Sequence, residues 1–278
     1  MIMLCVSRHF GRAAVVLAVL ALSGCASMTP GDLDRVRPDS DRPYAGNVYL
    51  LRGFIGIWSY GIDHLGQRIN EAGIRASVYQ QDQSQRLCEA IIERYSKATD
   101  PEPLVLIGHS YGADDALRIA KQLEEHNIKV DLVITLDPVT PPKVPANIGL
   151  CYNIYQPNLL DDLPFFRGIP LEPEKPEVKN LQNVNIRAER RDLLLPDTDH
   201  FNIEKNTLIH AEVVSKIKQV CPPREKWVQM RQAARTGTAM RASPSNDPAA
   251  AGSAVPPAAA GRPVGSALPT GQMAPPVP

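Results

Sequence analysis

A strand that turns directly into a helix at a Gly-x-Ser-x-Gly motif is the feature of this sequence that most restricts its fold. The apolar run at residues 103–108 leads into GHSYG at residues 108–112, and helical periodicity follows at residues 113–127. A run that is apolar throughout is typical of a strand buried on both faces of a parallel sheet. The sharp turn at this motif exposes the serine hydroxyl beyond the end of the strand, so Ser110 is the expected nucleophile. The alternative is that Ser110 is only a small residue in a tight turn.

Strand and helix signals alternate through the region from Tyr44 to Pro223. Short apolar runs predict strands at residues 47–53, 74–80, 103–108, 130–139, 150–156 and 183–189. Amphipathic periodicity predicts helices at residues 61–73, 84–98, 113–127 and 206–220. Such alternation implies β-α-β crossovers and a sheet covered on both faces. The expected fold is therefore α/β, with a single, mostly parallel sheet of about six strands flanked by helices.

The first 24 residues have the order of parts found in an export signal. Arg8 and Arg12 precede an apolar segment at residues 13–22, which is too short to span a bilayer as a helix. The segment ends in LSGC, which resembles the lipobox of bacterial lipoprotein signal peptides. That resemblance implies cleavage before Cys25, acylation of this cysteine with chains such as palmitate, and a membrane anchor. Ala26 favours the outer membrane, facing the periplasm. The alternative is an ordinary secretory signal with a chance cysteine.

Composition separates the remaining chain into three parts. Residues 25–43, rich in Asp, Arg and Pro, are expected to be a tether between lipid and fold. Residues 44–223 form the expected catalytic domain. Residues 224–278, and most clearly those from about Arg231, are rich in Ala, Pro, Gly and Ser and predict a disordered tail. The formal net charge of zero argues against nucleic acid as a partner. The oligomeric state is not indicated.

The three cysteines of the expected domain are Cys88, Cys151 and Cys221. In an oxidising compartment one pair of them could form a disulfide and leave one free thiol. Three reduced, buried cysteines are the equal alternative. The spacing does not decide between the two.

A nucleophilic serine needs a histidine base, which should follow it in the chain after an acid. His64 and His126 lie on helical patterns, and His109 precedes the serine and should point away from it. His200 lies in the segment after the last expected strand, where the base belongs. His210 falls inside the final helix and is expected to be a packed or surface residue. His200 is therefore the predicted base.

The acid has two sets of candidates. Asp137 ends the strand that follows the nucleophile, which would direct its side chain to the same rim as Ser110. Asp161 and Asp162 follow the next strand, but they stand several residues past its end in the Pro-rich segment 157–182, which is expected to be a long surface loop. We favour Asp137 and keep the pair as the alternative. Asp199 adjoins His200, and adjacent side chains rarely face one another.

Two backbone amides are expected to bind the oxyanion formed during acyl transfer. Tyr111 opens the helix after the serine, where N–H groups have no partner within the helix. The second donor usually follows an earlier strand, and LLRGFIGIWSYG at residues 50–61 is that segment, so Phe54 is the candidate. Trp58 and Tyr60 would line the substrate side, or would simply pack at the rim.

The succession YLLRGFIG, VLIGHSYG, VITLDPV and DTDHFNI resembles the α/β-hydrolase superfamily in its lipase and thioesterase-like branch. The resemblance covers about Asn47 to Val220. Arg52 stands where many members have His, and the two antiparallel strands that often begin the sheet have no room before Asn47. The resemblance implies a compact hydrolase without a helical cap domain, acting on a small-molecule acyl ester with no metal and no cofactor.

Three functions remain open at this point. The first is a serine hydrolase that cleaves carboxylic esters, from lipids or small molecules, through an acyl-enzyme. The second is a thioesterase, which is less natural outside the cytoplasm. The third is a non-catalytic envelope lipoprotein that uses the scaffold for binding, since a fold does not guarantee activity.

Overall fold

The computed structural model describes residues 29–53, 60–157 and 168–242. Its strands are β1 (Asn47–Leu51), β2 (Arg75–Tyr79), β3 (Leu104–His109), β4 (Val130–Leu136), β5 (Ile148–Tyr155) and β6 (Leu181–Asn185). Its α-helices are α2 (Tyr60–Glu71), α3 (Ser84–Tyr95), α4 (Tyr111–Glu125), α5 (Thr207–Val220) and α6 (Arg224–Ala242). Short 3-10 turns are η1 (Leu33–Arg35), η2 (Gln81–Gln83), η3 (Arg191–Leu193) and η4 (Ile203–Lys205).

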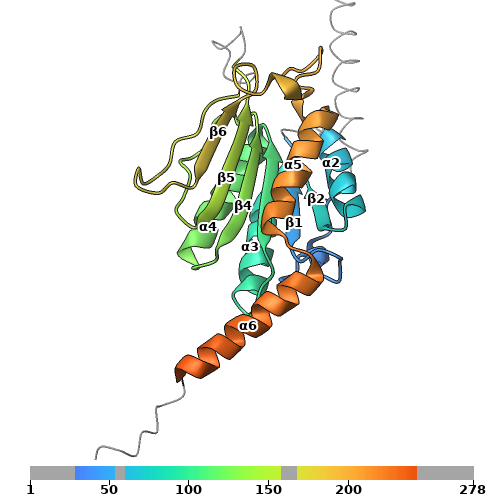
Figure 1. The fold of residues 1–278 in the computed structure, drawn as a ribbon. Helices are drawn as coiled ribbons and strands as arrows, with labels where there is room; N and C mark the ends of the chain where they lie inside the picture. Colours follow the sequence, from blue (N-terminus) through green and yellow to red (C-terminus); the bar gives the residue numbers. More distant parts are fainter. Residues whose placement is uncertain (1–28, 54–59, 158–167, 243–278) are drawn as a thin grey trace, which may run out of the picture. The chain divides into compact units, whose positions relative to one another are not determined.

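The six strands pair in parallel in the order β2-β1-β3-β4-β5-β6 (Figure 1). The expected α/β class and the single parallel sheet flanked by helices are confirmed. All strands therefore end at one edge of the sheet, which we call the carboxyl edge, and begin at the opposite, amino edge. In an open α/β sheet the carboxyl edge is where ligands bind.

Alternating side chains of each strand build a separate core on each face of the sheet. In β1, Val48 and Leu50 pack with α2 and α5, whereas Tyr49 and Leu51 pack with α3 and α4. Figure 1 shows the same division, with α2 and α5 over one face and α3 and α4 over the other. Because both faces are covered, the central strands β1, β3 and β4 are almost completely buried and largely apolar.

The first described segment, residues 29–43, is bound to the domain, whereas the sequence predicted a free tether there. Residues 29–43 make hydrogen bonds with several elements of the domain, including β1, β2 and α3. The Asp, Arg and Pro content was typical of a spacer, but the backbone carbonyls of this segment are bound by side chains far away in sequence. The expected signal peptide lies outside the described residues.

The carboxy-terminal end also differs from expectation, because helix α6 begins at Arg224, where the tail was expected to start. The chain divides into two compact units, residues 1–233 and 234–278, so α6 crosses their boundary. Residues 243–278 lie outside the description. Among the described helices, none is both long and apolar enough to span a membrane.

The cysteines of the domain do not pair. Cys88, Cys151 and Cys221 are all free and buried. Burial raises the pKa of Cys88 to about 11 and that of Cys221 to about 12. Of the two alternatives left open by the spacing, the structure has the three reduced thiols.

Candidate active site

Ser110 occupies a strained turn between β3 and α4. Its φ is 56° and its ψ is −127°, a backbone conformation that residues other than glycine rarely adopt. The backbone N–H of Ser110 donates to the carbonyl of Leu136 at 2.9 Å, which ties the turn to the end of β4. A Cβ at Gly112 would lie 2.5 Å from the carbonyl oxygens of Leu51 and Arg52, so only glycine lets α4 start this close to β1.

His200 lies against Ser110 although 90 residues separate them in the chain. Its Nε2 is 3.1 Å from the Oγ of Ser110, and its side chain is buried. The histidine follows η3 in the segment after β6, as the sequence predicted. The three-dimensional arrangement therefore brings together the predicted nucleophile and the predicted base.

Asp137 faces the other nitrogen of the same ring. Its Oδ2 lies 3.4 Å from Nδ1 of His200, and the residue is completely buried. The backbone N–H of Gln156 donates to Oδ1 at 2.8 Å. Burial raises the pKa of Asp137, while His200 and the Gln156 amide act in the opposite direction by favouring the carboxylate.

Gln156 and Gly168 surround this carboxylate, and sequence reasoning missed both. A Cβ at Gly168 would lie 2.0 Å from Oδ1 of Asp137, so the backbone closes directly over the acid. The N–H of Gly168 donates to the carbonyl of Gln156 at 3.3 Å. Gln156 directly precedes the Pro-rich segment 157–182 and Gly168 lies within it, and no sequence periodicity marked either residue.

The other candidates for acid and base lie elsewhere. Asp161 and Asp162 are outside the described residues. Asp199 accepts the backbone N–H of Phe201 at 2.8 Å. His210 is buried on α5, with its Nε2 2.7 Å from the carbonyl of Glu204, as a packed histidine would be.

The side chain of His109 contacts the backbone of His200. Its Nε2 lies 2.9 Å from the carbonyl oxygen of His200, and the two ring centroids are 5.3 Å apart. Burial lowers the pKa of His109 to about 3, so its ring is neutral at physiological pH and Nε2–H can donate to that carbonyl. The sequence placed His109 away from Ser110 but did not indicate this contact.

The residues expected to bind an oxyanion are described in part. Tyr111 is the first residue of α4. Phe54 and Trp58 lie outside the described residues, and Tyr60 is 45% exposed at the start of α2. Arg52 is buried, and its Nε donates to Oδ2 of Asp63 at 3.0 Å. This ion pair joins the end of β1 to the first turn of α2, across the segment that contains Phe54.

Two buried acids, Asp114 and Glu204, lie near the site. Asp114 accepts the backbone N–H groups of Val139 at 3.0 Å and Thr140 at 2.9 Å, which fixes the chain just after Asp137. Glu204 is completely buried in η4 beside the start of α2. Burial, the largest effect, raises its pKa to about 8.

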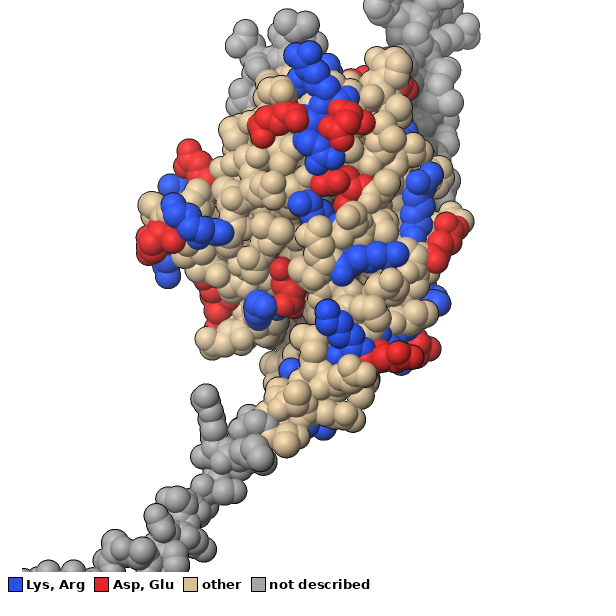
Figure 2. Space-filling model, in the orientation of Figure 1, with Lys and Arg blue, Asp and Glu red and all other residues tan. Residues whose placement is uncertain are grey.

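On the face shown in Figure 2, basic and acidic side chains are interspersed. Within the described ranges, no three or more His, Cys, Asp or Glu side chains gather as a metal site requires.

The parallel sheet and the strand-turn-helix at Ser110 define an α/β hydrolase. The model of the thioesterase-domain family matches residues 65–216, more than half of the chain, and the chain belongs to this family. It is accordingly a hydrolytic enzyme of the ester and thioester class.

Several solved structures are similar to the chain at low sequence identity. No curated protein sequence matches the chain. A serine hydrolase without a lid from Xanthomonas campestris is 16% identical over 66% of this chain and 85% of its own, with a TM-score of 0.39. Est1E from Butyrivibrio proteoclasticus is 13% identical over 63% and 87%, with a TM-score of 0.39. The NocB thioesterase domain of the nocardicin cluster is 13% identical over 63% and 93%, with a TM-score of 0.37. These values carry no argument about substrate.

Proposed function

We propose that this chain is a serine hydrolase that cleaves carboxylic esters through an acyl-enzyme intermediate. The observation that carries the proposal is the position of the His200 ring. One of its nitrogens lies 3.1 Å from the hydroxyl of Ser110, and the other lies 3.4 Å from the carboxylate of Asp137. Nucleophile, base and orienting acid in this geometry are the requirements of acyl transfer.

Each residue has one role in the proposed reaction. Ser110 attacks the carbonyl carbon while His200 takes its proton, and His200 then returns the proton to the leaving alcohol. Asp137 holds the imidazole in the correct tautomer and stabilises the imidazolium. The backbone N–H groups of Tyr111 and Phe54 would receive the negative charge on the substrate oxygen. Water repeats the sequence to release the acid.

A thioester is the second candidate substrate, and membership of the thioesterase-domain family favours it. The same residues would act in the same order, with a thiol as the leaving group. We place carboxylic esters first because the lipobox predicts export, and coenzyme A thioesters are scarce outside the cytoplasm. Comparing kcat/KM for an acyl ester and the matching acyl thioester separates the two.

We also propose that Cys25 carries the lipid and holds the enzyme to the bacterial envelope, on the periplasmic face of the outer membrane. Support comes from the order of positive residues, apolar segment and lipobox in residues 1–25. Several acyl chains on one cysteine would give stable anchoring, where a single chain would not.

A fluorophosphonate probe, which forms a covalent bond with an activated serine, tests the catalytic proposal. Wild-type protein should be labelled and should hydrolyse p-nitrophenyl esters. Ser110→Ala should not be labelled, and its rate of ester hydrolysis should be at least about 10³-fold lower, because removing the nucleophile leaves only residual catalysis. Ser96→Ala, at an exposed serine of the same domain, is the matched control and should behave as wild type. An unlabelled, inactive wild-type protein would favour the non-catalytic alternative.

A further inference from the structure

The segment from Thr29 to Pro43, which we call the strap, is bound from one edge of the sheet to the other. At the carboxyl edge, an Arg52 Nη atom donates to the carbonyl of Thr29 at 3.2 Å. The Gln83 side chain, just beyond β2, both donates to the carbonyl of Gly31 and accepts its N–H, each at 2.8 Å. The strap therefore begins beside the end of β1, close to the turn that carries Ser110.

The middle of the strap is held over the α3 side of the sheet. The Tyr79 hydroxyl donates to the carbonyl of Asp32 at 2.9 Å. The Tyr49 hydroxyl, halfway along β1, accepts the N–H of Arg37 at 3.0 Å, and Tyr95 donates to the carbonyl of the same residue at 3.1 Å. Several independent side chains thus fix the direction of the strap.

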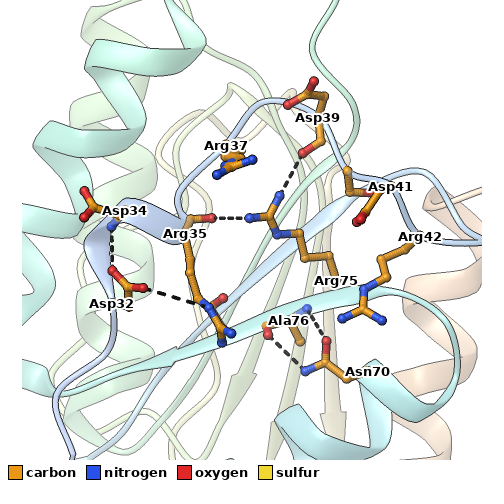
Figure 3. A pocket seen from close by; sticks show the side chains of 12 residues that line it. Asp32, Asp34, Arg35, Arg37, Asp39, Asp41, Arg42, Asn70, Arg75 and Ala76 are labelled. Atoms are coloured by element: carbon orange, nitrogen blue, oxygen red, sulfur yellow. Dashed lines mark hydrogen bonds and ion pairs between the residues drawn. The ribbon is translucent and has the colours of Figure 1, made fainter.

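The strap ends at the amino edge. Arg75, the first residue of β2, donates to the carbonyls of Arg35 at 2.9 Å and Asp39 at 3.0 Å (Figure 3). The Ser40 hydroxyl donates to Glu102, just before β3, at 3.0 Å. The cavity of about 560 Å³ drawn in Figure 3 lies between this part of the strap and β2. The strap therefore runs antiparallel to the strands, from their carboxyl ends to their amino ends.

This direction determines which edge a lipid on Cys25 would reach. Thr29 is the fourth residue after Cys25, and an extended chain covers at most about 3.5 Å per residue, so the anchor would lie within about 14 Å of Thr29. If residues 25–43 were a free tether, Cys25 could lie up to about 60 Å from Pro43, and the domain could take any orientation to the membrane. With the strap bound, the short reach places the anchor at the carboxyl edge.

Three exposed large apolar side chains lie at the same edge, while two others, Val228 and Met230, lie on α6, which begins at the amino edge. Tyr60, at the start of α2, is 45% exposed, and Phe201, next to His200, is 39% exposed. Leu208, in the first turn of α5, is 39% exposed. Large apolar side chains at an edge that also carries a membrane anchor are suited to contact with a lipid surface.

We infer that the carboxyl edge, with the active site, faces the membrane that holds the lipid of Cys25, and that the substrate is an acyl ester resident in that membrane. The inference rests on the proposed hydrolase function and on the proposed lipidation. Because the strap is bound to the domain, the lipid on Cys25 would hold Ser110 at the membrane surface, where amphiphilic esters are concentrated.

The orientation can be measured without catalysis. The lipidated full-length protein carrying Ser110→Ala is reconstituted in phosphatidylethanolamine–phosphatidylglycerol vesicles that contain a spin-labelled lipid. A fluorophore is attached either at Leu208→Cys or, as the matched control, at Lys129→Cys beside the amino edge. Quenching at residue 208 should exceed that at residue 129 at least about threefold. Equal quenching, or more at residue 129, would overturn the inference whether or not the enzyme is active.

The substrate class is tested by lengthening the connection. A flexible Gly/Ser spacer of twenty residues between Met28 and Thr29 leaves the strap and the lipid in place but removes the fixed orientation. Hydrolysis of a long-chain ester embedded in vesicles should fall several-fold, while hydrolysis of soluble p-nitrophenyl acetate should not change. Unchanged rates on both would overturn the inference, whereas absence of both in the parent protein would instead refute the proposed function.

Discussion

Two of the three residues to which we assign catalytic roles have a positive φ, 56° at Ser110 and 48° at Asp137. Strain of this kind persists only where surrounding contacts determine the backbone, and it is concentrated at functional sites. The N–H of Ser110 is tied to Leu136, and the N–H of Asp137 is tied to Ile154 at the end of β5. The sheet thus holds both residues in conformations they would not adopt alone.

Exchange of the acid is the most direct test of its assignment. Asp137→Asn should lower kcat on p-nitrophenyl esters by about 10⁴, because the amide favours the wrong His200 tautomer and cannot stabilise the imidazolium. Asp161→Asn and Asp162→Asn should each keep most of the activity. If either of the latter two abolished hydrolysis while Asp137→Asn did not, the acid would belong to the segment after β5.

The buried Glu204 should make stability depend on pH. Its pKa is about 8 in the folded chain and about 4.5 when exposed. Between these values the unfolded chain loses this proton and the folded chain keeps it, so this carboxyl makes the free energy of unfolding fall as pH rises from about 5 to 8. Glu204→Gln removes the effect.

Thermal or urea unfolding across this pH range measures the contribution. The stability of Glu204→Gln relative to wild type should increase with pH, by up to about 1.4 kcal/mol per unit. The exposed Glu177→Gln is the control and should follow wild type at every pH. A difference between Glu204→Gln and wild type that stayed constant with pH would mean that Glu204 is ionised in the folded chain throughout.

Among the elements, the strap differs most from what its sequence predicted, because it is bound to the domain and is not a free tether. Its carbonyl groups would otherwise be free to bind water, yet Arg75, Arg94, Tyr79 and Tyr95 each donate to them. Hydrogen bonds from charged donors contribute more than neutral ones. Most of these donors lie on elements that also form the core, so the strap should remain bound as long as the domain is folded.

Removing one donor should loosen the strap locally. Arg75→Met loses the bonds to Arg35 and Asp39 and keeps the aliphatic part of the side chain. We expect a loss of about 1 kcal/mol in the free energy of unfolding. Amide hydrogen exchange should accelerate at residues 35–40 and not in β3 or α4. The exposed Arg86→Met on α3 is the control, and equal exchange in both variants would show that Arg75 does not hold the strap.

For the whole molecule, the proposed anchor at Cys25 would govern access to a substrate in the membrane. Cys25→Ala should move the protein from the membrane fraction to the soluble periplasmic fraction, or should block its maturation, because the acylated thiol is lost. Fractionation followed by immunoblotting, with and without detergent, measures this. A variant that still needed detergent for release would have an anchor other than Cys25.

The sequence by itself determined the architecture of the domain and the strand-turn-helix that carries Ser110, the proposed nucleophile. Strand and helix periodicities are local properties, so all six strands and the four helices that cover the sheet were predicted, with small errors at their ends. The motif at residues 108–112 predicted Ser110 for the same reason, since a strand, a turn and a helix adjoin there. His200 followed from its place after the last strand.

Only the tertiary structure decided which distant groups meet. The contact of Asp137 with His200, and the enclosure of Asp137 by Gln156 and Gly168, depend on how the segments after β4, β5 and β6 meet. The pKa of Glu204 depends on how completely the fold buries it. The binding of the strap, and with it the edge that an anchor at Cys25 would reach, depends on side chains up to 184 residues away, whose pairing no local pattern records.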